Sequence, residues 1–197
     1  MNHRFTAIGD GPRSSRVDRP STRWDDRGAA LIEFALLLPF LAILVFGTID
    51  LSRASQLRNR LTNAAREGAA FGQFSPQYVN PGCNGGRSID RAVMREDPGL
   101  GVTRNDIQVS RVRTTAGVTT EVPYWNGPAD SPGATACDNP VAVSGGTPIT
   151  FDRSPTNPDR VSVEVTQNLE ILTPLVAAII GTDQVKLRGR AEAVIQG

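Results

Sequence analysis

The longest apolar stretch of the chain runs from residue 29 to residue 49, and its only polar side chains are Glu33 and Thr48. As a helix, these 21 residues would extend about 31 Å. That length matches the hydrocarbon thickness of a bilayer, about 30 Å. Because lipid offers the backbone no hydrogen-bond partners, a segment that crosses it must be helical. The pattern therefore predicts one transmembrane helix over residues 29–49, with a kink at Pro39.

The helical pattern continues beyond the apolar stretch, from residue 50 to residue 72. Apolar and small residues recur there in steps of three and four, which places them on one face of a helix. They are Leu51, Ala54, Leu57, Leu61, Ala64, Ala65, Gly68 and Ala69. We therefore expect one continuous helix over residues 29–72, whose first half is buried in lipid and whose second half is amphipathic. Gly72 and Ser75-Pro76 are expected to end it.

The amphipathic face could pack against either of two partners. One is the C-terminal part of the same chain, and the other is the helix of a neighbouring subunit. Small residues such as Ala64, Ala65 and Gly68 permit close approach in either case.

The C-terminal region, residues 73–197, alternates in a way typical of strands. Residues 107–112 and 119–125 fit two strands, the second weakened by Pro123. Residues 161–166 and 185–195 alternate apolar and polar side chains, which predicts two half-buried antiparallel strands with a bulge at Gly189. A short helix over residues 88–96, with Ser88 as its N-cap, precedes them. The fold class expected is α+β: a long N-terminal helix followed by a small antiparallel-sheet domain.

The last two strands are joined by an apolar segment in which Thr173 and Pro174 fit an N-cap and a first helical residue. The short helix that follows cannot span a bilayer. It is expected to pack on the sheet, or else to rest on the membrane surface or on a partner.

Residues 126–159 carry many prolines and glycines and are expected to form a long loop with little capacity for a core. Cys137 lies in this loop, and Cys83 lies in an earlier one. A lone pair of cysteines in an oxidising compartment predicts a disulfide, Cys83–Cys137. The alternative is two unpaired buried cysteines.

Residues 1–28 are rich in arginine, aspartate, serine, glycine and proline and show no hydrophobic periodicity, which is typical of a disordered leader. The apolar stretch is too long for the core of a secretory signal peptide, so we expect it to remain as an anchor. Five arginines from Arg13 to Arg27 precede the anchor and four from Arg53 to Arg66 follow it. This slight excess favours a cytoplasmic N-terminus. The cysteines would then lie in an extracytoplasmic domain.

Composition points away from an enzyme. His3 is the only histidine, and there is no CxxC, HExxH or phosphate-binding glycine loop. The formal net charge of +1 gives no indication of a nucleic-acid partner. We expect no catalytic residues, no cofactor, no metal and no small-molecule substrate.

The remaining chemical feature is Glu33 inside the apolar stretch, five residues after Gly28 and directly before Phe34. A charged side chain costs about 2.5–3.5 kcal/mol at the centre of a membrane helix and less near the interface. One interpretation is that Glu33 lies close enough to the surface to reach the headgroups. The other is that the carboxylate has a function in the membrane.

The arrangement of Gly28, Ala29, Glu33 and Phe34 resembles the processing site of type IV prepilins. Residues 27–72 more specifically resemble the TadE-like family of the Tad (tight adherence, Flp pilus) system. The matching residues are Arg27-Gly28-Ala29-Ala30, Glu33-Phe34-Ala35-Leu36, Leu38-Pro39, Gly47, Asp50, Arg53 and Asn63-Ala64-Ala65-Arg66-Glu67-Gly68-Ala69. Thr173-Pro174-Leu175 and the final strand are similar in style to the family.

The resemblance implies that a prepilin peptidase cuts between Gly28 and Ala29 on the cytoplasmic side, and that Glu33 is recognised in processing or assembly. Cleavage would create an α-ammonium on Ala29 at the start of a helix, where the helix dipole disfavours positive charge. Glu33 of the same or a neighbouring chain could compensate that charge.

The resemblance therefore implies a pilin-like fold and a minor pilin or pseudopilin that acts with other Tad pilus components. The long leader and large C-terminal domain favour that role over the main filament subunit. One alternative is a generic anchored extracytoplasmic domain without processing. Another is an adhesion or binding module that uses the loop around Trp125 and Cys137.

Overall fold

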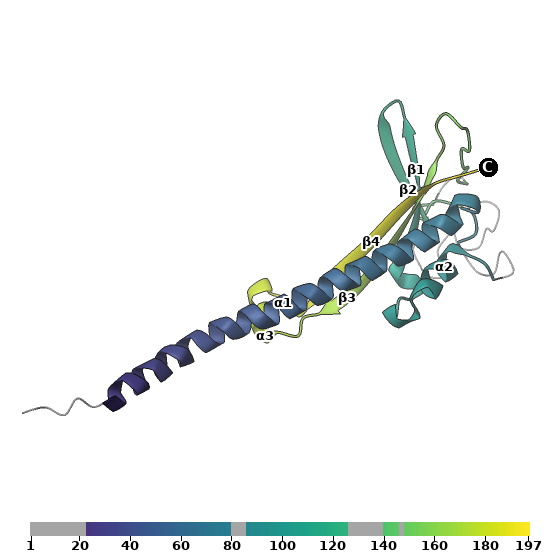
Figure 1. Ribbon diagram of the computed structural model, residues 1–197. Coiled ribbons are helices and arrows are strands. Elements are labelled where there is room, and N and C mark those ends of the chain that lie inside the picture. Colours follow the sequence, from purple (N-terminus) through teal and green to yellow (C-terminus); the bar gives the residue numbers. More distant parts are fainter. Residues whose placement is uncertain (1–22, 80–85, 126–139, 146–147) are drawn as a thin grey trace, which may run out of the picture. The chain divides into compact units, whose positions relative to one another are not determined.

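The computed structural model describes residues 23–79, 86–125, 140–145 and 148–197. The chain divides into two compact units, Met1–Leu41 and Ala42–Gly197. The second unit combines helices with one antiparallel sheet (Figure 1), which confirms the predicted α+β class.

Helix α1, Arg23–Phe74, contains 52 residues, among them Pro39. A single helix through the apolar and amphipathic halves was predicted and is confirmed. It begins six residues before the predicted start at Ala29 and ends two residues after Gly72. Pro20 is the last helix-breaking residue before Arg23, so an established helix can extend backwards through residues 23–28 at little cost.

The remaining elements follow in the order helix, strands, helix, strand. They are α2 (Ile89–Glu96), β1 (Ile107–Thr115), β2 (Val118–Trp125), β3 (Arg160–Glu170), α3 (Pro174–Ile180) and β4 (Gln184–Val194), with short 3-10 turns at Pro98–Leu100 and Arg104–Asp106. All four predicted strands and both predicted short helices are present. Ser88 occupies the N-cap position of α2 as expected, but its hydroxyl bonds to Asp90 instead of capping the backbone.

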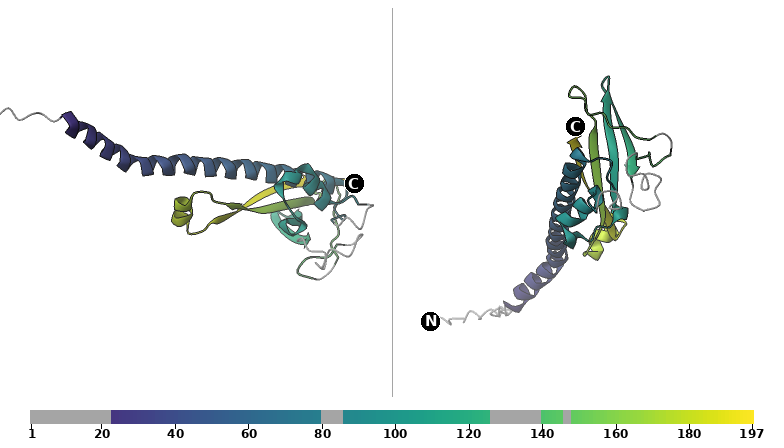
Figure 2. Two further views of the ribbon diagram at one scale, coloured as in Figure 1. Left: turned by 90° about the horizontal axis from the view of Figure 1, so that it is seen from below. Right: turned by 90° about the vertical axis from the view of Figure 1, so that its right-hand side faces the viewer.

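The four strands form one sheet in the order β2-β1-β3-β4, and every neighbouring pair is antiparallel (Figure 2). β1 and β2 form one hairpin, and β3 and β4 form another that carries α3 in its connection. Pro123 is tolerated in β2 because β2 is an edge strand, where the missing N–H removes no central ladder bond.

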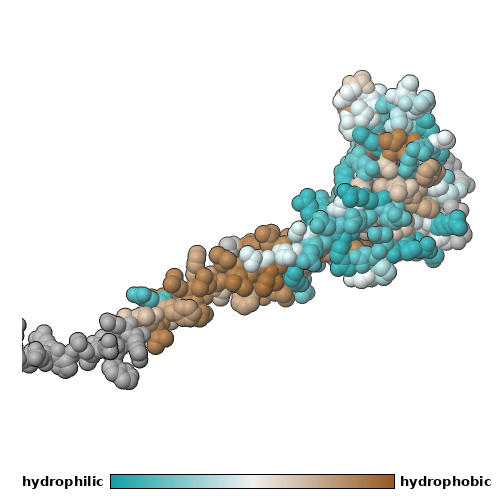
Figure 3. Space-filling view, viewed as in Figure 1, coloured by the Kyte–Doolittle hydropathy of each residue, from teal (hydrophilic) through white to brown (hydrophobic). Residues whose placement is uncertain are grey.

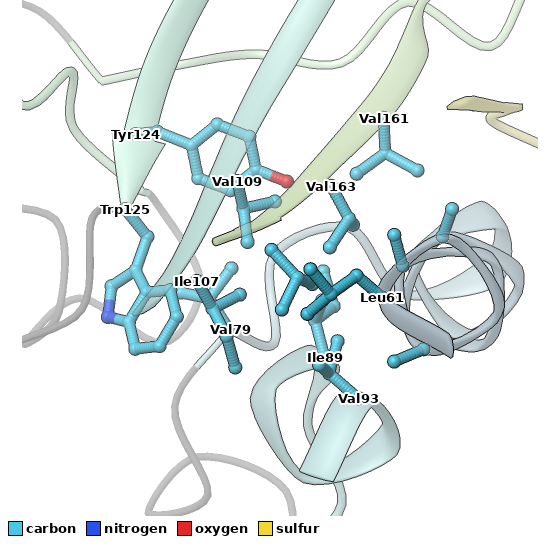
Figure 4. Close-up of a cluster of buried hydrophobic side chains, with 14 of the residues drawn as sticks. Leu61, Val79, Ile89, Val93, Ile107, Val109, Tyr124, Trp125, Val161 and Val163 are labelled. Carbon is cyan, nitrogen blue, oxygen red and sulfur yellow. The ribbon is translucent and has the colours of Figure 1, made fainter. Parts of the chain in front are cut away.

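One face of the sheet carries the alternating valines of β3 and packs against helices. Val161, Val163 and Val165 are fully buried. Val163 and Val165 pair with Val109 and Ile107 of β1, and Val161 lies opposite Arg111. Leu61 from α1 and Ile89 and Val93 from α2 point into the same cluster (Figure 4). The opposite face is charged. Arg188 of β4 pairs with Glu164 of the neighbouring β3, and Arg190 pairs with Glu121 of β2 at the far edge of the sheet.

The outer half of α1 packs on its own chain, so the first of the two predicted partners for its small-residue face is correct. Leu61, Ala64 and Ala65 are fully buried, and Ala69 is nearly so. A Cβ at Gly68 would lie 2.5 Å from Val93 Cγ2, so only glycine allows the helices and sheet to come this close. Leu51, at the start of the predicted face, is not covered and remains 70% exposed.

The predicted bulge at Gly189 is wrong. β4 pairs with β3 in unbroken register from Arg160–Val194 to Glu170–Gln184, and Gly189 lies opposite Val165. A Cβ at Gly189 would overlap the backbone of Leu61 and Thr62. The glycine is required because α1 crosses β4 at this point with no room for a side chain.

The segment expected to be a loop without a core contributes to the core in its second part. Ile149 is buried, and the Phe151 ring lies edge-on against Tyr124 with the centroids 5.5 Å apart. Asp159 is fully buried and bonds Arg113 of β1, Nε to Oδ1 at 2.7 Å. Burial alone would raise the pKa of Asp159, but hydrogen bonds from Arg113 and from the Asp152 N–H outweigh it and lower the pKa. This buried ion pair fixes the end of the segment on the sheet.

A second ion pair holds the end of α2 to α1. Arg60 donates to both carboxylate oxygens of Asp97, with Nη2–Oδ1 at 2.8 Å. These hydrogen bonds hold the pKa of Asp97 below its usual value.

Gly189→Ala should destabilise the domain, because the added methyl must displace the backbone of α1. Overpacking of this kind typically costs about 1–3 kcal/mol. Thermal unfolding of the full chain in detergent, followed by near-ultraviolet circular dichroism, measures the loss. Gly47→Ala is the matched control, since nothing lies within 4 Å of a Cβ at that position. Equal unfolding temperatures for the two variants would contradict the account of Gly189.

Candidate functional site

The predicted processing stretch lies within α1 and is open to its surroundings. Gly28, Ala29 and Glu33 are exposed, and Phe34 is 57% exposed. The stretch is followed by further exposed apolar residues, so α1 contains a segment long and apolar enough to cross a membrane. In the space-filling view, hydrophobic colour follows this part of α1, and much of the sheet domain is hydrophilic (Figure 3).

The glycines of α1 fall into two groups. Gly68 and Gly72 are packed against Val163 and Val161, so the fold itself requires them. For Gly28 and Gly47, no atom of the described residues lies within 4 Å of the position of a Cβ. Glycine inside a helix costs about 0.5–1 kcal/mol relative to alanine. Within the part of the chain that the structure describes, no packing contact accounts for that cost at Gly28.

Asp50 is the second element of the site, and it directly follows the apolar stretch. Its carboxylate is buried and accepts hydrogen bonds from the segment that begins α3. Thr173 donates its hydroxyl to Oδ2 at 2.7 Å and its N–H to the same oxygen at 3.2 Å. The N–H of Leu172 donates to Oδ1 at 3.3 Å. A single carboxylate on α1 therefore holds the start of α3, 123 residues further along the chain.

Arg53 completes this contact. Its guanidinium lies 3.4 Å from Asp50 Oδ1 and donates to the carbonyl oxygen of Glu170 at 3.4 Å. Thr173 is the N-cap of α3, but its hydroxyl is used on Asp50 and makes no cap bond to the helix backbone. Asp50 and Arg53 thus connect α1 to the end of β3 and to the start of α3.

The short helix α3 does not cover the sheet, although that was the first expectation. It lies beyond the end of the β3–β4 hairpin (Figure 2). Thr173 and Pro174 do form its N-cap and first residue, as predicted. The reason for its position is the set of bonds to Asp50, which no local pattern in the sequence displays.

The contact between Asp50 and Thr173 was not predicted from the sequence. Asp50 and Arg53 were noted as residues that resemble the family pattern, and Thr173 was predicted only as the N-cap of the short helix. A single acid at the end of an apolar stretch is a weak signal by itself, because such residues commonly face solvent. The only sequence signal for this contact was that Asp50 and the Thr173-Pro174 pair both resemble the family pattern.

Other predicted sites meet different outcomes. Cys83 and Cys137 lie outside the described residues, so their disulfide stays a prediction. Trp125 is 1% exposed and belongs to the core, so its ring is not available to an external partner. Among the described residues, no group of three or more histidine, cysteine, aspartate or glutamate side chains could hold a metal ion.

Comparison with known proteins identifies one family. The model of the protein family described as "TadE-like protein" matches residues 28–70 of this chain. The resemblance seen in the sequence is thereby confirmed over this segment, which contains Gly28, Glu33 and Asp50, and it indicates a protein related to Tad pili. No curated protein and no solved structure matches the chain.

Asp50→Ala should release the start of α3. The amides of Leu172 and Thr173 lose their acceptor, and their hydrogen exchange in the full chain should become markedly faster. Thr173→Val should weaken the same contact, whereas Thr173→Ser keeps the hydroxyl and serves as the control. In a double-mutant cycle with Thr173→Val, Asp50→Ala should show a coupling of about 0.5–3 kcal/mol. Additive effects would show that the contact does not operate in solution.

Proposed function

We propose that this chain is a minor pilin or pseudopilin of the TadE-like kind, which acts in the assembly of a Tad (Flp) pilus. In this proposal a prepilin peptidase cuts the chain between Gly28 and Ala29. The chain is a structural and assembly component and not an enzyme. It uses no cofactor, nucleic acid or small-molecule substrate.

The observation that carries the proposal is Gly28, a glycine inside a helix that no atom of the described residues requires. The Gly28–Ala29 bond is helical in the uncut chain, so a peptidase must first open the helix there. Glycine weakens the helix at this position, which favours local opening at the bond to be cut. The absence of a side chain also lets the backbone approach the peptidase closely. The TadE-like match begins at this same residue.

Glu33 supports the second part of the proposal. It is an exposed carboxylate among apolar neighbours, with Ile32 and Phe34 on either side both more than half exposed. Cleavage leaves an α-ammonium on Ala29, one helical turn before Glu33. This charge meets the unfavourable positive end of the helix dipole. We propose that Glu33 compensates it, within one chain or between neighbours in the assembly.

The proposed arrangement places residues 1–28 in the cytoplasm and residues 73–197 outside the cytoplasmic membrane. The arginine distribution supports this orientation. Partners in this arrangement are the membrane, the prepilin peptidase and other Tad pilus components.

Two alternatives differ in measurable ways. A generic anchored domain would keep residues 1–28. An adhesion module would depend on residues 126–159, so deleting them would abolish surface attachment while pili remained intact. The burial of Trp125 removes one side chain from the surface that such a module would use.

Gly28→Val should abolish processing. Among the described residues nothing lies within 4 Å of a Cβ at this position, so the variant should still fold and insert. The valine side chain should block close approach of the peptidase to the bond. Mass spectrometry of the chain purified from the native host should find an N-terminus at Ala29 for the unaltered protein and at Met1 for the variant. Gly47→Val makes the same change at another unpacked glycine of α1 and should be cut normally. An unaltered chain that begins at Met1 would refute the processing proposal.

Glu33→Ala should impair pilus assembly and leave membrane insertion intact, because alanine removes the carboxylate but keeps the helix. Glu33→Asp should retain part of the function, since it keeps the charge. Electron microscopy of surface pili, with membrane fractionation as the control, measures both outcomes. Normal pilus numbers in the alanine variant would rule out the proposed role of Glu33.

A further inference from the structure

We propose that the tip of the β3–β4 hairpin inserts into the interface of the membrane that holds the anchor, in the leaflet from which α1 emerges. The hairpin tip is defined as residues 171–181, which include α3. The proposal goes beyond a role in pilus assembly. It rests on the membrane anchor alone, so it can hold even if the chain is not processed.

The tip has the composition of a membrane-inserting segment. Its eleven residues carry no charge, and Thr173 is their only side chain with a hydrogen-bonding group. Leu172 is 63% exposed and Ile180 is 54% exposed, whereas the apolar residues in the middle of β3 are fully buried. These large apolar side chains are therefore left uncovered by the domain that carries them.

The structure also fixes the position of the tip along α1. Because Thr173 bonds Asp50, the tip lies beside the residue that directly follows the apolar stretch. Phe46 and Ile49 belong to that stretch, and they line a hollow of about 290 Å³ together with Leu172 and Pro174. If Phe46 and Ile49 lie in hydrocarbon, Leu172 and Pro174 are at the same level.

Asp50 also lines a second apolar hollow. It measures about 260 Å³ and is lined by Leu51, Ala54, Val176 and Ile180 among other residues, with Asp50 as the only charged member. Leu51 is 70% exposed, although the next turns of the same face are covered by the sheet. Both hollows therefore continue the apolar surface of α1 onto the hairpin.

Lipid is the occupant that this continuity favours. The exposed apolar surface begins on residues that the anchor places in the bilayer, and it ends where charged residues resume on both elements. On α1 that residue is Arg53. On the hairpin they are Glu170 before the tip, and Asp183 and Lys186 after it. Long basic side chains at such a boundary can reach the headgroups while their stems stay in apolar surroundings. Interfacial segments of this type enter about 5–10 Å into the boundary between headgroups and acyl chains.

Insertion would give the domain a second attachment to the membrane. A domain held by one helix can rotate and tilt about it, whereas a second contact restricts both motions. Asp50 has a defined part in this arrangement, because it holds the tip against α1 and its carboxylate is satisfied by Thr173 and Leu172. The domain would then face its partners at a fixed height above the membrane.

Fluorescence depth measurement tests the proposal on the full chain. Ile180→Trp and Leu172→Trp each place a probe on the tip, and Val118→Trp places one on the β1–β2 hairpin at the opposite end of the sheet. All three native side chains are more than half exposed, so the variants should fold, and each should melt at the temperature of the unaltered protein. The chain is reconstituted in phosphatidylcholine vesicles whose acyl chains are brominated either near the headgroup or near the chain end. The emission of the unaltered chain, which contains Trp24 and Trp125, is subtracted.

The two tip probes should lose most of their added emission to lipid brominated near the headgroup and less to lipid brominated near the chain end. They should resist quenching by aqueous acrylamide. The Val118→Trp probe should be quenched by acrylamide and should lose little emission to either brominated lipid.

Quenching of the tip probes by acrylamide to the same extent as the control would place the tip in water and overturn the proposal. Protection from both quenchers, together with chemical cross-linking between copies, would show that a second copy covers the tip, and this would overturn it equally. Neither result would bear on cleavage at Gly28, which is measured separately.

Discussion

The close approach of α1 to the sheet is the contact on which the rest of the domain depends. Helix and sheet meet through residues with small side chains or none: Ala64, Ala65 and Gly68 on the helix and Gly189 on β4. Close contact maximises dispersion between the surfaces and excludes water from the valines of β3. It also explains why α1 continues so far beyond its apolar stretch. The outer half of the helix contributes Leu61, Ala64, Ala65 and Ala69 to the hydrophobic core.

This arrangement leaves no separate linker between residues 42–74 of α1 and the sheet. From residue 42 onward, α1 belongs to the same compact unit as the sheet. Asp50 and Arg53 add polar contacts to the end of β3 and to the start of α3. A force or a change of orientation applied to this part of α1 would therefore be passed directly to the domain.

The helix also shows how structural and functional requirements separate along one element. Gly68 and Gly72 are explained by neighbouring side chains, whereas Gly28 and Gly47 have no neighbours that require them. The first pair serves the fold. A residue that weakens a helix without improving its packing indicates a requirement outside the folded chain. In this way an exposed glycine is more informative about function than a buried one.

The sequence by itself determined the elements and their classes. The apolar stretch over residues 29–49, the small-residue face after it, the alternation in β3 and β4 and the Gly28–Glu33 spacing are all local patterns, and each depends only on neighbours along the chain. Local periodicity also sufficed for the α+β class, whereas particular residues within 27–72 carried the resemblance to the TadE-like family.

Only the tertiary structure decided which distant segments meet. Gly189 looked like a bulge because its missing side chain interrupts the alternation, but the cause is the backbone of Leu61 lying against it. Ile149 and Phe151 join the core from a segment whose composition is that of a loop. The bond between Asp50 and Thr173 could not be read from the sequence, because neither residue has a local partner that predicts it. Contacts across more than a hundred residues depend on how the helix crosses the sheet, and that crossing is fixed by packing, not by pattern.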